Sequence, residues 1–222
     1  MAPPGVRDRS YADTTVAPGT SPVGTTTSFY LDGEPLPAIP ANPLIGATPT
    51  NPRVLHVGAF AGEPSSTQGF VDELAIFRDA LPSEAIRAIA TAASSTFCRR
   101  NDQGCVAPPP GLVSWYRFEQ MEGALDDAGQ APNEPLLLSS SSLRAPGRVG
   151  AGLRLREPGG FARTLSATAK LSFSSAFTLS VWIRPTNATG ARTLRLRSAA
   201  LRVQLLHRRV YPYPHRPAQS WL

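Results

Sequence analysis

Residues 69–86 read GFVDELAIFRDALPSEAI and predict one strand followed by one short helix. Phe70, Leu74 and Ile76 fit a strand with one buried face. The other face can be covered by Val71, Ala75 and Phe77. Pro82 suits the start of a helix, and Glu84 lies in the first turn, where the helix dipole favours an anion. We therefore expect a buried strand and then a helix over residues 82–92.

Two adjacent carboxylates, Asp72 and Glu73, interrupt this apolar strand. Burying a charged group is costly unless the group binds a partner, caps a backbone donor or reaches solvent. The pair is therefore the first candidate for a functional role.

The remainder of the chain reads as an all-β protein with one short helix. Strand-forming residues recur in short runs that are separated by Gly, Pro, Ser and Thr, a pattern that favours a β-sandwich. The 222 residues contain no apolar run of about 20, so we expect no membrane span. The N-terminal residues lack the apolar core of a secretory signal peptide.

The net charge of +6 is concentrated at one end of the chain. Residues 191–222 contain seven arginines and no acidic residue, so the rest of the chain has a net charge of −1. Basic tails can bind nucleic acid or anionic membranes. This tail contains no recognised binding module, and we expect no nucleic-acid partner.

Seven short motifs, in order, resemble those of the LamG-like jelly-roll family, part of the laminin G and concanavalin A-like group of β-sandwiches. Each motif alone is weak, but their order along the chain makes the resemblance specific. The motifs are FYLDGEP (29–35), VLHVG (54–58), VDEL (71–74), GLVSWYRF (111–118), DAG (127–129), GRVGAGL (147–153) and FTLSVWIRP (177–185).

The first three motifs match the second half of such a domain, and the last four match the first half. The implied organisation is a disordered segment (1–28), a C-terminal half-domain (29–93), a linker with a cysteine pair (94–110), an N-terminal half-domain (111–190) and a basic, poorly ordered tail (191–222). A half-sandwich would leave an apolar face in water, at a cost of about 25 cal/mol per Å². Either the halves pair within this chain as a circularly permuted jelly roll, or the chain is an incompletely folded fragment.

The resemblance also implies a calcium site. In this family the DxSG turn and the strand with the Asp-Glu pair often approach one another around calcium, which here implicates Asp72, Glu73, Asp127 and Asn133. Carboxylate and amide oxygens are the ligands that Ca²⁺ prefers. The alternative is that Asp127 caps its own turn and Glu73 is exposed to solvent. Calcium is the one cofactor that we expect.

Cys98 and Cys105 are separated by six residues that include a glycine, so the two ends of this loop can meet and the cysteines can form a disulfide. The alternative is a pair of reduced thiols.

Tyr30 and Phe60 lie near loops and are candidate ligand contacts. Trp115, Tyr116 and Trp182 lie within predicted strands, which favours core packing over a sugar-stacking platform.

Catalysis finds no support in the sequence. No Ser-His-Asp or Cys-His arrangement can be placed, and Glu119 and Glu122 do not form the motif of the glucanases that share this broad fold.

The resemblance implies a non-catalytic extracellular or cell-surface module of a parent protein, which binds a glycan or a protein through loops at one rim. The alternatives are a structural spacer in a tandem-repeat surface protein and a gene fragment without independent function.

Overall fold

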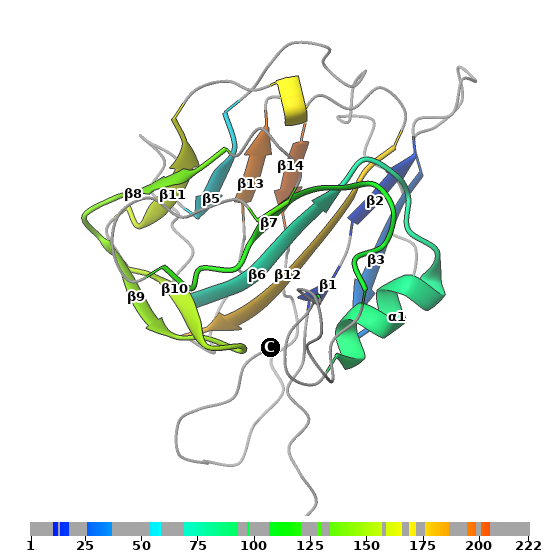
Figure 1. Ribbon diagram of the computed structural model, residues 1–222, viewed down its shortest axis with the longest axis horizontal. Coiled ribbons are helices and arrows are strands. Elements are labelled where there is room, and N and C mark those ends of the chain that lie inside the picture. Colours follow the sequence, from blue (N-terminus) through cyan, green and yellow to red (C-terminus); the bar gives the residue numbers. More distant parts are fainter. Residues whose placement is uncertain are drawn as a thin grey trace, which may run out of the picture.

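In the part of the chain that the structure describes, the fold consists mostly of antiparallel β-strands with one α-helix (Figure 1). The computed structural model describes residues 11–12, 14–17, 26–36, 54–58, 69–92, 97, 107–120, 128–129, 134–156, 159–165, 169–171, 176–186, 195–198 and 201–204. No helix within these ranges is long and apolar enough to cross a membrane.

Among the described residues, the first sheet has six strands and is centred on β6. Along the path of the sheet the strands are β1 (Tyr11–Ala12), β12 (Thr178–Pro185), β6 (Gly69–Phe77), β10 (Ala151–Leu155) and β9 (Ser142–Pro146), with β7 (Leu112–Tyr116) also paired to β6. All nine residues of β6 are buried, which agrees with apolar side chains on both faces of the strand, apart from Asp72 and Glu73.

Over the same described ranges, the second sheet has five strands and the third has three. The second sheet is β14 (Leu201–Gln204), β13 (Arg195–Ser198), β5 (His56–Gly58), β11 (Phe161–Thr164) and β8 (Leu136–Leu138). The third is β2 (Thr14–Ala17), β3 (Thr26–Leu31) and β4 (Glu34–Pro35). A 3-10 helix, η1, covers Ala169–Leu171.

The main hydrophobic core draws on both of the larger sheets. The first sheet contributes Val71, Leu74, Ile76, Leu153, Leu155, Leu179, Val181 and Ile183, and the second contributes Val57, Leu136 and Ala162. The two sheets thus bury one face each against the other, as in a β-sandwich.

The opposite face of the first sheet is partly covered by helix α1 (Ser83–Thr91). Pro82 is the N-cap residue, and Ile86 and Ile89 are the buried positions of the helix. They join a second apolar cluster that includes Phe77 and Trp115. The prediction of a strand followed by a helix over residues 82–92 is confirmed to within a residue at each end.

Strands from the two predicted half-domains share both larger sheets. β6 pairs with β7, β10 and β12, and β5 pairs with β11, so each stretch completes the sheets of the other. This is the arrangement that pairing within one chain requires.

Strands also lie in the N-terminal stretch that the sequence predicted to be disordered and in the C-terminal stretch that it predicted to be poorly ordered. β1 and β2 lie within residues 1–28, and β13 and β14 lie within residues 191–222. β1 extends the first sheet beside β12, and β13 extends the second beside β5. The exposed edge of a sheet offers unpaired backbone donors and acceptors, and these pairings satisfy them.

Candidate functional site

The Asp72–Glu73 pair lies where β6 changes its partner along one edge. Residues 69–71 of β6 pair with β10, and residues 74–77 pair with β7. On the opposite edge, the pairing with β12 shifts register between Ser180 and Trp182. Glu73 has a φ of 51°, so the pair forms a β-bulge with a left-handed residue.

Asp72 is fully buried and fixes a neighbouring turn. Its Oδ1 accepts a hydrogen bond from the backbone N–H of Glu73, and its Oδ2 accepts one from the N–H of Val149, both at 2.9 Å. Burial raises the pKa of Asp72 from 3.8 to about 8, although the backbone donors act in the opposite direction. The nearby charge of Glu73 raises the pKa further.

The turn held by Asp72 connects β9 to β10 and spans residues 147–150. Within it the N–H of Gly147 donates to the carbonyl oxygen of Gly150 at 2.9 Å. At its far end Glu119 Oε2 accepts a hydrogen bond from the N–H of Ala151 at 3.1 Å. Two carboxylates from different segments therefore hold this turn, one at Val149 and the other at Ala151, the residue that follows it.

Glu73 is also fully buried, and its side chain contacts β7 and the segment after it. Its Oε2 accepts a hydrogen bond from the indole N–H of Trp115 at 2.9 Å, and Arg117 Nε lies 4.0 Å from its Oε1. The Arg117 guanidinium lies 5.1 Å from the centroid of the Trp115 ring. The alternative in which Glu73 is exposed to solvent is therefore wrong, because β7 and its continuation cover the carboxylate.

The four predicted calcium ligands are only partly placed. Asp72 and Glu73 are adjacent, whereas Asp127 and Asn133 lie outside the described residues. Both oxygens of Asp72 accept backbone N–H groups and one oxygen of Glu73 accepts the indole N–H, so three of the four oxygens already have protein donors. Within the described ranges no group of three or more His, Cys, Asp or Glu side chains could hold a metal ion. The two carboxylates alone therefore do not fit a calcium site.

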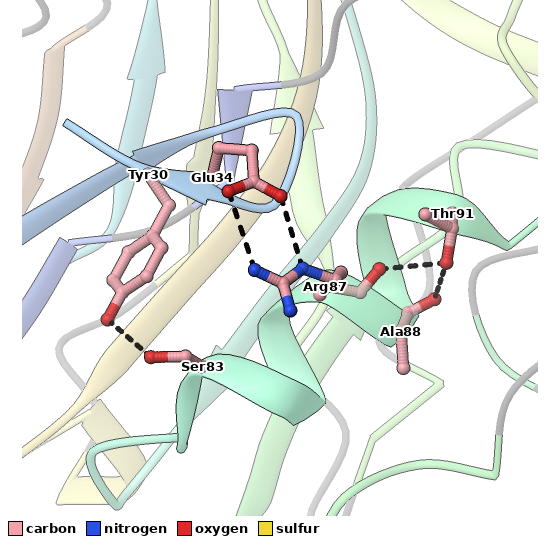
Figure 2. A network of polar contacts seen from close by, with 6 residues as sticks. All are labelled: Tyr30, Glu34, Ser83, Arg87, Ala88 and Thr91. Carbon is pink, nitrogen blue, oxygen red and sulfur yellow. Dashed lines mark hydrogen bonds and ion pairs between the residues drawn. The ribbon is translucent and has the colours of Figure 1, made fainter.

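Tyr30, a predicted ligand contact, joins β3 to helix α1 (Figure 2). Its hydroxyl lies 3.2 Å from the hydroxyl of Ser83, and its ring packs against the apolar cluster beneath the helix. Glu34 of β4 forms an ion pair with Arg87 of α1 at 3.2 Å. The other predicted contact, Phe60, and the predicted disulfide between Cys98 and Cys105 lie outside the described residues.

The aromatic residues of the predicted strands lie in the interior. Trp115, Tyr116 and Trp182 are 3%, 0% and 4% exposed. The prediction of core packing for these three residues is confirmed. Tyr116 satisfies its hydroxyl by donating to the carbonyl oxygen of Glu134 at 2.9 Å.

A cluster of arginines over aromatic rings was not predicted from the sequence. Arg154 and Arg184 lie over the ring of Phe70, and Arg148 lies over the ring of Trp182. Arginine and aromatic residues are visible in the motifs of these strands, but only the strand register places them beside one another.

Comparisons of the chain with protein-family models, with curated proteins and with solved structures found no match. The chemistry of the site must therefore be inferred from its geometry. Asp72 and Glu73 are inaccessible to a substrate, and together with Glu119 they accept hydrogen bonds from the backbone and from an indole. The arrangement holds a turn and a strand junction in place.

Proposed function

We propose that this chain is a non-catalytic LamG-like β-sandwich module that binds a glycan or a protein partner. The support is a β-sandwich in which strands of both motif groups share the sheets, together with the order of the motifs themselves. In this proposal the sandwich is a jelly roll whose halves follow one another in permuted order. Its place is in a secreted or cell-surface parent protein, as the resemblance implies.

The observation that carries the proposal is the double anchoring of the turn at residues 147–150 by Asp72 and Glu119. A loop held by rigid strands presents its side chains in a fixed geometry, which lowers the entropy cost of binding. By contrast, a general acid or base must come within hydrogen-bond reach of the substrate. Asp72 and Glu73 are 0% exposed, so they support the scaffold and do not act on a ligand.

A glycan array tests the proposal. The purified chain is first shown to unfold in one cooperative step, and it is then applied to the array as a fluorescent conjugate. We expect binding to a restricted set of glycans, or capture of one surface protein by cross-linking, with the bound glycan recovered intact. A folded chain that retains no glycan and no protein would instead be a structural spacer, and cleavage of the bound glycan would contradict a non-catalytic role.

A further inference from the structure

A row of residues crosses four strands on the face of the first sheet that points away from the main core. Leu143 of β9 opposes Arg154 of β10, and Arg154 and Arg184 both oppose Phe70 of β6. Residues directly opposite one another in a sheet lie on the same face. Trp182 lies two residues before Arg184 on β12 and therefore shares this face.

Three guanidinium groups cover the aromatic rings of this face. The Cζ atoms of Arg154 and Arg184 lie 5.5 and 3.9 Å from the centroid of the Phe70 ring. The Cζ atom of Arg148, from the turn between β9 and β10, lies 4.7 Å from the centroid of Trp182. Phe70 and Trp182 are only 9% and 4% exposed, so the rings support the arginines and offer little surface of their own. Stacking of this kind orients a guanidinium and limits its motion.

Within the described residues, two of these arginines have no acidic partner. Arg148 and Arg154 form no ion pair with any described residue, and Arg154 is exposed. Asp72 lies nearby, but it is buried and both of its oxygens accept backbone N–H groups. Like charges that lie close together repel one another, and a bound anion would relieve that repulsion.

We propose that this arginine face, formed by Arg148, Arg154 and Arg184, binds a polysaccharide chain that bears carboxylate or sulfate groups. The inference rests on the proposed function and specifies its ligand class. The arginines come from β10, β12 and a turn, and neighbouring strands are about 4.8 Å apart, so the face suits a series of anionic groups better than a single one. Guanidinium forks match carboxylate and sulfate oxygens and bind them through charge-assisted hydrogen bonds.

The geometry favours an acidic polysaccharide over other polymers. Neutral sugar rings and unpaired bases are commonly bound by stacking on open aromatic faces, and here the guanidinium groups lie over those faces. An extended peptide is commonly bound by addition to the edge of a sheet, whereas this site is the face of four paired strands.

Binding to dextran sulfate and to polygalacturonate, with neutral dextran as the reference, tests the inference. We expect the chain to bind both anionic polymers and to lose affinity as salt rises, whereas neutral dextran is not bound. The double variant Arg154→Gln/Arg184→Gln should lose about tenfold or more in affinity. Arg163→Gln removes the same charge from an exposed position on β11 of the second sheet, and it should change affinity by less than about twofold.

A second double variant, Arg154→Lys/Arg184→Lys, keeps the charge and removes the planar forks. It should bind the anionic polymers more weakly than the parent chain while unfolding at a similar temperature. Equal losses for Arg163→Gln and the glutamine double variant would overturn the inference, as would binding of single-stranded DNA or polyglutamate with equal affinity. If the chain binds only neutral glycans on an array, this inference fails and the proposed function stands. If it binds no glycan and no protein, the proposed function fails as well.

Discussion

Asp72 Oδ2 accepts a hydrogen bond from the backbone N–H of Val149, 2.9 Å away and 77 positions later in the chain. The bond joins the central strand of the first sheet to the turn between β9 and β10. It therefore connects the two stretches of sequence that resemble separate half-domains. Because Asp72 is fully buried, this connection depends on the protonation state of its carboxyl group.

Stability should fall as the pH rises through the range in which Asp72 is protonated only in the folded state. Burial raises the pKa of Asp72 to about 8, whereas in the unfolded chain it titrates near its usual 3.8. Between these values the unfolded chain releases a proton that the folded chain keeps, so each pH unit costs up to about 1.4 kcal/mol. The stabilisation that comes from the raised pKa of Asp72 is fully present below pH 4. It is lost progressively up to about pH 8 and changes no further above that value.

The variant Asp72→Asn removes this titration and should have a flatter profile. Urea unfolding between pH 4.5 and 8.5 measures the free energy of unfolding of both proteins. Asp79→Asn, a change at an exposed carboxyl group, is the matched control and should follow the parent profile. Parallel profiles for the parent and Asp72→Asn would show that Asp72 does not titrate in this range.

Glu73 and Trp115 should be energetically coupled. Replacing Trp115 with Phe leaves the buried Glu73 Oε2 without its indole donor, and a buried acceptor that loses its partner costs about 1–3 kcal/mol. In a double-mutant cycle with Trp115→Phe and Glu73→Gln, we expect a coupling energy of about 1 kcal/mol or more from chemical denaturation. Additive losses would mean that the 2.9 Å contact contributes no coupling.

The glycine at position 147 should tolerate no side chain. A Cβ there would overlap Asp72 Oδ2 and the backbone of Ala151, and the backbone of a paired strand cannot move aside cheaply. We expect Gly147→Ala to cost about 2–3 kcal/mol of unfolding free energy. Gly159→Ala is a useful control, because a Cβ at that position meets nothing within 4 Å and only its φ of 74° is unfavourable. Its cost should be about 1 kcal/mol, and a larger cost than that of Gly147→Ala would contradict the proposed overlap.

Local sequence signals predicted the elements whose own residues decide their conformation. The dipeptide Asp32–Gly33 is itself a local signal for a hairpin turn, and its φ values of 55° and 80° are those of a turn that favours Asp-Gly. Helix α1 was predicted from Pro82 and Glu84, and it begins at Ser83. In both cases the deciding interactions lie within a few residues.

The role of the Asp72–Glu73 pair depends on contacts that no local pattern contains. The cost of burying two carboxylates was evident from the sequence, and it correctly marked the pair as unusual. Its partners, however, are the N–H of Val149 and the indole of Trp115, which lie 77 and 42 positions away from them. The same holds for the arginine face, because it arises only when β10 and β12 align with Phe70.

The attachment of α1 to the β3–β4 hairpin should depend on close backbone packing far more than on its ion pair (Figure 2). Glu34 and Arg87 have side chains that are 66% and 54% exposed, and exposed pairs contribute about 0–1 kcal/mol. We therefore expect Arg87→Ala to lower the free energy of unfolding by less than about 1 kcal/mol.

Gly33 lies beneath the helix, and a Cβ at this buried position would stand 2.9 Å from the Cα of Arg87. Gly33→Ala combines that overlap with an unfavourable φ of 80°, so it should cost about 2–4 kcal/mol. Thermal or urea unfolding of both single variants measures the difference. A loss for Arg87→Ala as large as that for Gly33→Ala would assign the attachment to the ion pair instead, and because exposed charges are screened, that loss would then diminish in high salt.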